Sequence, residues 1–309
     1  MTTYDASPYL SGNFAPVGVE STALDLPVIG SIPDELSGRF LRSGPNPRET
    51  PDMEKHHWFF GEGMVHGVRL GGGRAQWYRN RYVGTADMGG PNTSIIGHAG
   101  KTLAIVEAGA KPMELTDELD RIGPTDLGGL PSGFTAHPKL DPLTGELHAV
   151  CYHWPDQVDK VHYVVVGADG VVSKAIPISA PTMPMIHDMA LTQSYGTVFD
   201  LPVAVDFEMA MGGSSFPLRW FHDYEARIGR RSTMPCMNFP ASPMPCRRCP
   251  IATATPLGEK PRRASGSTPR SSAICKPGLR KRATTASSAR WANRCLWRVS
   301  RQGPRTTAG

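Results

Sequence analysis

Cysteine and long apolar runs are both scarce in residues 1–229, although five of the six cysteines of the chain follow in residues 230–309. Cys151 is the only cysteine in residues 1–229, which argues against a disulfide-based fold and fits a reducing compartment. No uninterrupted apolar run approaches the roughly 18 residues of a membrane span. Residues 1–17 also lack the basic start and apolar core of a signal peptide. These absences predict a cytoplasmic protein without a membrane-spanning helix.

Acidic residues are nearly absent from the last part of the chain. Residues 230–309 contain one acidic residue, Glu259, against 17 Lys and Arg, whereas residues 1–229 contain 27 acidic and 16 basic residues. The overall net charge of +5 therefore conceals two chemically different segments. Histidine is also missing from residues 230–309, so this segment cannot supply imidazole ligands to a metal.

Residues 230–309 lack hydrophobic periodicity and are rich in Arg, Pro, Ser, Ala and Thr. Such a composition cannot build much of a core, so we expect a low-complexity, largely disordered basic tail. Three origins compete: a frameshift into a non-native reading frame, a genuine disordered tail, and a nucleic-acid-binding arm. The abrupt change after Gly229 favours the frameshift. No specific nucleic acid is expected as a partner, because the basic runs lack interleaved aromatic residues apart from Trp291 and Trp297.

Helix-period segments are missing from residues 1–229, where short β-rich runs alternate with glycine or aspartate turns. We expect strands over residues 64–70, 75–83, 103–107, 147–154, 161–166 and 171–178, and apolar loops over residues 180–185 and 209–217. Strands at this density predict an all-β repeat fold such as a β-propeller, whose blades take about 40–50 residues each. Residues 1–229 then form an incomplete ring, and residues 1–35 wrap around its outside.

Two histidines occupy similar places fifty residues apart, close to the length of one propeller blade. His137 and His187 each lie at a short turn before an apolar, strand-like run. Equivalent positions in neighbouring blades point at the same axis. Four neutral imidazoles arranged in this way suit a ferrous ion, but two alone would not hold the ion securely.

Five sequence blocks follow one another in the order of a known family. They are GRFLRSGPNPR, GEGMVHGVRL, NTSIIGHAGKTLAIVEAG, TAHPKLDPLTGEL and IHDMALTQSYGTVFDLP, within residues 8–229. In these blocks the chain resembles the N-terminal half of a carotenoid cleavage oxygenase, a family that includes apocarotenoid- and stilbene-cleaving dioxygenases. The resemblance implies part of a seven-bladed β-propeller.

The resemblance also implies a chemistry. Members are nonhaem Fe²⁺ dioxygenases that hold the ion with four histidines and use O2 to cleave a conjugated C=C bond into two carbonyl products. By position in the motifs, His137 and His187 match two of the four ligands. Glu107 matches a carboxylate that orients a ligand histidine. The implied partners are O2 and an apolar conjugated small molecule, together with peripheral membrane contact.

The resemblance bears on substrate and activity as well. Stilbene-cleaving members have a lysine directly before the matching glutamate, so Val106 favours a carotenoid or apocarotenoid over a stilbene. Only two of the four ligands are present, so we expect this chain to have at most trace activity. The rival interpretation is a noncatalytic, propeller-derived binding protein with a basic nucleic-acid-binding tail. The remaining histidines are expected to be structural: His56, His57, His66, His98, His148, His153, His162 and His222.

Overall fold

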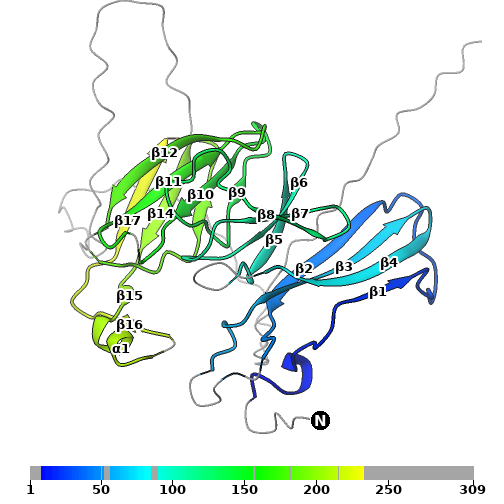
Figure 1. The fold of residues 1–309 in the computed structure, drawn as a ribbon. Coiled ribbons are helices and arrows are strands. Elements are labelled where there is room, and N and C mark those ends of the chain that lie inside the picture. The colour runs from blue at the N-terminus through cyan, green and yellow to red at the C-terminus, as the bar shows by residue number, and fades with distance from the viewer. Residues whose placement is uncertain are drawn as a thin grey trace, which may run out of the picture.

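The chain folds almost entirely into antiparallel β-sheets, as the sequence predicts (Figure 1). This computed structural model describes residues 8–49, 51, 56–84, 90–155, 157–180, 182–214 and 216–232, with the side chains of residues 231 and 232 left out. The predicted basic tail lies outside the described residues from position 233 onward. In the described part, the helices are a five-residue α1 (Phe207–Met211) and a single 3-10 turn, η1 (Gly12–Phe14).

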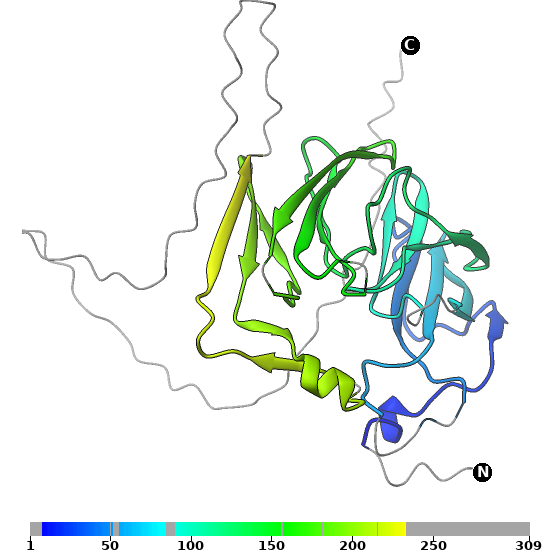
Figure 2. The same cartoon turned by 60° about the vertical axis from the view of Figure 1, so that its left-hand side comes forward.

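Four sheets follow one another along the chain as the blades of a partial propeller (Figure 2). The first sheet contains β1 (Ser21–Leu24), β2 (Gly38–Pro45), β3 (Gly63–Gly71) and β4 (Arg74–Tyr82). The second contains β5 (Ser94–His98), β6 (Lys101–Ile105), β7 (Met113–Leu115) and β8 (Arg121–Pro124). The third contains β9 (Lys139–Leu140), β10 (Leu147–Cys151), β11 (Lys160–Val166) and β12 (Val172–Ser179).

The fourth sheet is interrupted by an insertion. Its strands are β13 (Met189–Leu191), β14 (Tyr195–Asp200) and β17 (Arg227–Ser232). Between β14 and β17 the chain forms a separate two-stranded ladder, β15 (Val203–Val205) and β16 (Leu218–Trp220), with α1 between them. The predicted apolar loop at residues 209–217 therefore contains the end of a short helix, whose N-terminus is capped by the Asp206 side chain accepting from the Met209 N–H.

The central strands of the third sheet are buried on both faces, because this sheet lies between the second and the fourth. On β10, Leu147 and Ala149 pack into one apolar core and Val150 packs into another. On β11, Val164 and Val165 likewise face opposite cores. The period-two alternation of a strand thus sends successive apolar residues to two different sheet interfaces.

A third apolar core joins the first sheet to the second. It includes Val65 of β3, Ala104 of β6 and Leu115 of β7, all less than one-tenth exposed. The outward faces of the first and fourth sheets are less covered: Phe40 of β2 is 37% exposed and Tyr195 of β14 is 45% exposed. This matches the expectation of an incomplete ring.

Most predicted strands are confirmed, with differences at their ends. The strand predicted over residues 147–154 ends at Cys151, and Tyr152 leaves the ladder to contact a neighbouring sheet. The strand β17 continues three residues past the predicted domain boundary at Gly229, and Ser232 pairs with Tyr195 of β14. Pairing to a neighbouring strand, rather than apolar periodicity, extends this strand.

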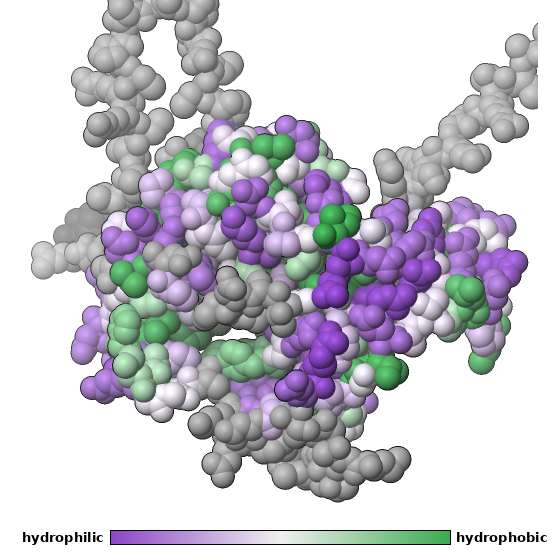
Figure 3. All heavy atoms as spheres, viewed as in Figure 1, coloured by the Kyte–Doolittle hydropathy of each residue, from purple (hydrophilic) through white to green (hydrophobic). Residues whose placement is uncertain are grey.

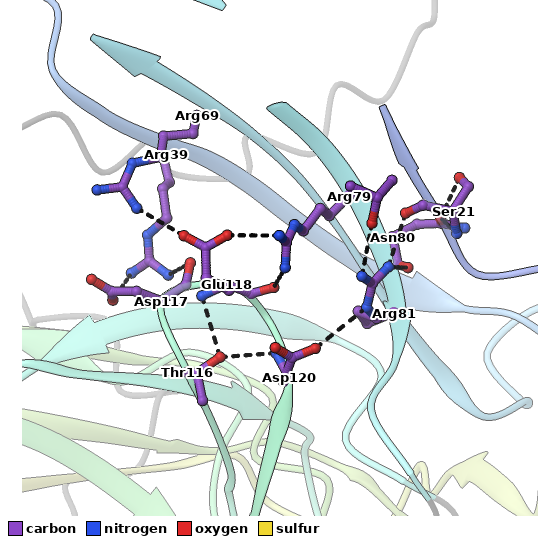
Figure 4. Close-up of polar contacts among 11 residues, drawn as sticks. Ser21, Arg39, Arg69, Arg79, Asn80, Arg81, Thr116, Asp117, Glu118 and Asp120 are labelled. Atoms are coloured by element: carbon purple, nitrogen blue, oxygen red, sulfur yellow. Dashed lines mark hydrogen bonds and ion pairs between the residues drawn. The ribbon is translucent and has the colours of Figure 1, made fainter. Parts of the chain in front are cut away.

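Ion pairs reinforce the junction between the first and second sheets (Figure 4). Arginines from β2, β3 and β4 contact acidic residues of the turn between β7 and β8: Arg39–Asp117 at 3.2 Å, Arg69–Glu118 at 3.2 Å, Arg79–Glu118 at 3.0 Å and Arg81–Asp120 at 3.6 Å. In the same turn, Leu119 adopts φ 69° and is fully buried in the third core. Charges and one apolar side chain therefore hold this turn against the first sheet.

Replacing Glu118 by glutamine should lower the free energy of unfolding by about 0.5–1 kcal/mol at low salt, because it removes two partly exposed ion pairs. The loss should shrink in about 1 M NaCl, where the Debye length is about 3 Å. Urea denaturation of both chains at low salt and in about 1 M NaCl measures this loss of free energy of unfolding. The control is Asp25→Asn, which breaks a highly exposed pair with Arg74 and should have little effect. An equal loss at both salt concentrations would contradict the electrostatic explanation.

Candidate metal centre

His137 and His187 occupy equivalent places in the third and fourth sheets. His137 precedes β9 by two residues, and His187 precedes β13 by two residues. The two imidazoles meet: their Nε2 atoms lie 3.1 Å apart, and their ring centroids lie 4.5 Å apart with the planes at 70°. The structure therefore brings the two predicted ligand positions together.

The spacing of the two nitrogens fits a shared metal ion. Two imidazole nitrogens that each lie about 2.1 Å from one ion, at a right angle, are about 3.0 Å apart. The observed 3.1 Å between the Nε2 atoms of His137 and His187 is close to this value. Among the described residues, no group of three or more His, Cys, Asp or Glu side chains is arranged to hold a metal. The described part thus offers two ligands and not a full set.

Glu107 is hydrogen-bonded to one of these imidazoles. It follows the end of β6, and its Oε2 accepts a hydrogen bond from Nδ1–H of His187. This hydrogen bond raises the pKa of His187, whereas burial and then the neighbouring imidazole lower the pKa of His137. With Nδ1 of His187 engaged in this way, its Nε2 presents a lone pair toward His137.

Tyr152 is a site residue that the sequence did not indicate. Its hydroxyl donates to Oε1 of Glu107 at 2.5 Å and accepts from the Ile186 N–H at 3.0 Å. Burial raises the pKa of Tyr152 well above its ordinary value, which keeps the phenol protonated as a donor. The sequence gives only a weak indication of this role, because Tyr152 directly follows an apolar strand and looks like another core residue.

A glycine allows the segment before His137 to lie close to the turn after Glu107. A Cβ atom at Gly133 would collide with the carbonyl oxygen of Gly109. Ala108, in the same turn, has a positive φ of 51°. The turn that carries Glu107 and the segment that leads to His137 are therefore packed backbone against backbone.

An ion pair connects the segments that follow the two histidines. Nζ of Lys139 lies 2.5 Å from Oδ1 of Asp188, and the same oxygen accepts from the Met189 N–H at 2.7 Å. Asp188 is thus engaged by Lys139 and by the backbone of Met189. The pair links β9 to the start of β13 beside the imidazoles.

Several of the other histidines have structural contacts of their own. His66 Nδ1 lies 2.9 Å from Tyr78 Oη, His98 Nε2 lies 2.7 Å from the Gly167 carbonyl oxygen, His148 Nδ1 lies 2.8 Å from Tyr163 Oη, and His57 stacks on Phe216. None of these partners is a second candidate metal ligand. That the remaining histidines are structural stays a prediction, for which these four contacts supply a physical basis.

Comparison with known protein families identifies the family of the chain. Residues 14–231 match the family model described as "RPE65: Retinal pigment epithelial membrane protein". The chain belongs to the RPE65 family. The match to this family, which includes the carotenoid cleavage oxygenases, covers all four sheets and contains His137, His187 and Glu107.

Relatives of known name share about half of their length with this RPE65-family chain. The carotenoid cleavage oxygenase of Mycobacterium tuberculosis is 47% identical over 245 residues, which cover 71% of this chain and 48% of that protein. The carotenoid 9,10(9',10')-cleavage dioxygenase of Crocus sativus is 37% identical over 257 residues, covering 66% and 46%. The crystal structure of Pseudomonas brassicacearum lignostilbene dioxygenase matches with a TM-score of 0.66 at 29% identity, covering 74% of this chain and 54% of that one.

Acidification is expected to destabilise the fold through buried neutral imidazoles. Burial lowers the pKa of His148, so the unfolded chain takes up a proton at a pH where the native chain does not. The stability that neutral His148 contributes is complete above about pH 6.5 and declines as the pH falls below it. Urea denaturation at about pH 7.5 and about pH 5.5 measures the decline, which His148→Gln should reduce.

The matched control is His222→Gln, at an exposed position. It should leave the pH dependence of the free energy of unfolding unchanged. If His148→Gln shows the same decline as the unmodified chain, groups other than His148 cause the acid sensitivity.

Proposed function

We propose that residues 8–232 form half of the nonhaem iron centre of a carotenoid-type cleavage oxygenase. The observation that carries this proposal is the convergence of two Nε2 atoms at 3.1 Å, with Nδ1 of His187 held by Glu107. In this proposal His137 and His187 are Fe²⁺ ligands and Glu107 orients the second of them. Neutral imidazoles suit Fe²⁺ and leave its charge undiminished.

A ferrous ion bound there would supply the activation of O2 for oxidative cleavage of a conjugated C=C bond into two carbonyl products. The chain's own residues prepare the ligands. Glu107 accepts a hydrogen bond from Nδ1–H of His187 and keeps the Nε2 lone pair directed at the site. Burial lowers the pKa of His137, which favours the neutral imidazole that a metal requires.

A carotenoid or apocarotenoid is the proposed substrate. The support is the 47% identity to a protein named carotenoid cleavage oxygenase and the apolar, half-buried Val106 directly before Glu107. Stilbene cleavage is the second candidate, favoured by the structural similarity to a lignostilbene dioxygenase at 29% identity. The rival binding-protein interpretation depends on residues 233–309, which lie outside the described part of the chain.

The 309 residues by themselves should show at most trace dioxygenase activity, because no histidine follows His222 and the family resemblance implies four ligands. The measurement is anaerobic reconstitution with Fe²⁺, followed by metal analysis and by oxygen uptake with an apocarotenoid and, separately, a hydroxystilbene. His137→Ala should abolish the weak iron binding, and Lys139→Met should retain most of it. Near-stoichiometric iron with turnover that disappears in His137→Ala would overturn the expected inactivity and support the metal site.

Peripheral membrane contact is proposed for the insertion between β14 and β17. Phe207 is 62% exposed, Met211 is 87% exposed and Trp220 is 54% exposed, and Figure 3 shows hydrophobic side chains at the lower left, where Figure 1 places this insertion. No helix in the described ranges is long and apolar enough to cross a membrane. The exposed apolar groups suit an interfacial contact that stops at the headgroups.

Replacing Phe207 and Met211 together by serine should reduce cosedimentation with phosphatidylcholine vesicles about tenfold or more, because two large apolar groups no longer enter the interface. The control is Leu143→Ser, which changes a side chain that is 78% exposed in the turn before β10. Equal binding of the unmodified chain and the double variant would exclude this surface as the membrane contact.

A further inference from the structure

Tyr152 lies where three consecutive sheets meet. It directly follows β10 of the third sheet and is 1% exposed. Its hydroxyl contacts Glu107, which follows β6 of the second sheet, and the N–H of Ile186, which leads into the fourth sheet. A single buried hydroxyl therefore connects these sheets one residue away from His187.

The direction of each hydrogen bond around this hydroxyl is determined by its partners. The Ile186 N–H can only donate, so the Tyr152 oxygen accepts there and its one proton goes to Oε1 of Glu107. Glu107 then accepts as a carboxylate and uses Oε2 for the Nδ1–H of His187. Because Nδ1 of His187 carries the proton, its Nε2 carries the lone pair, and this atom faces His137.

We propose that Tyr152 is a positioning residue: through Glu107 it holds His187 in the Nδ1–H tautomer, with the Nε2 lone pair directed toward the place where a divalent cation would bind. Only the effect on cation affinity rests on the proposed metal centre. The effect on the tautomer is a property of the metal-free chain.

The Tyr152 hydroxyl matters because it is the hydrogen-bond partner of two largely buried groups at once. Without it, the Ile186 N–H and one oxygen of the Glu107 carboxylate lose a buried hydrogen-bond partner. The carboxylate is then able to rotate away from His187, and the imidazole loses the group that determines its tautomer. The aromatic ring of Tyr152 packs in the same apolar core as Val150 and Tyr163, so a phenylalanine can keep that packing.

The first experiment measures the tautomer of His187 in the metal-free 309-residue chain by long-range ¹H–¹⁵N correlation spectroscopy. The unmodified chain should show a single Nδ1–H tautomer, and Tyr152→Phe should show a mixture of both tautomers. The matched control is Tyr163→Phe, which removes another buried hydroxyl of the same core, 2.8 Å from Nδ1 of His148. It should leave the His187 signals unchanged. An unchanged His187 tautomer in Tyr152→Phe overturns the proposal.

The second experiment titrates the same chains with Co²⁺ and follows binding by calorimetry. Loss of an outer hydrogen-bond partner typically weakens metal binding about 10- to 100-fold, and a loss in this range is expected for Tyr152→Phe and not for Tyr163→Phe. Equal weakening in both variants would show a general effect of core damage and overturn the proposal. If the unmodified chain binds no Co²⁺ while the tautomer responds as expected, the proposed iron centre fails and the positioning role of Tyr152 stands.

If Tyr152→Phe does not fold, the unmodified chain itself provides the test. The hydroxyl proton of Tyr152 should then appear as a slowly exchanging resonance with a nuclear Overhauser effect to the Ile186 amide proton, because both lie at a buried hydrogen-bond junction. A rapidly exchanging hydroxyl would overturn the proposal.

Discussion

Burial of both faces of the inner strands is the constraint on which the rest of the structure depends. A strand such as β11 alternates its apolar residues between two cores, so it is stable only while a sheet lies on each side. Fully burying a side chain such as valine or leucine contributes about 1.5–3 kcal/mol, and these two cores contain most of the described apolar residues of the third sheet. The third sheet must therefore pack one face against the second sheet and the other face against the fourth.

The same stacking produces the candidate metal centre. Because the third and fourth sheets repeat one geometry, the residues two places before their first strands, β9 and β13, reach the same location. His137 and His187 occupy that location in the third and fourth sheets, and their Nε2 atoms meet at 3.1 Å. Neither histidine needs an unusual local structure, since the convergence follows from the repetition of the sheets.

The polar groups next to this site are bonded to one another. Glu107, Tyr152 and the Ile186 backbone share a continuous series of hydrogen bonds, which avoids the cost of burying an unpaired carboxylate. Lys139 and Asp188 add an ion pair at the more exposed side. Residues from three sheets take part, so the orientation of the imidazoles depends on how the sheets are packed.

The sequence by itself determined the all-β class and most strand positions, and it nominated His137, His187 and Glu107, which the structure brings within hydrogen-bonding distance of one another. Strand periodicity and turn residues are local signals, and the motif blocks that contain the site residues are short and contiguous. The tertiary structure decided what depends on contacts between distant segments: the end of β10 at Cys151, the extension of β17 past Gly229, and the hydrogen bonds of Tyr152. Tyr152 and Glu107 are 45 residues apart, and Glu107 and His187 are 80 apart. Only the packing of one sheet against the next brings such residues within hydrogen-bonding distance, and no local pattern encodes that approach.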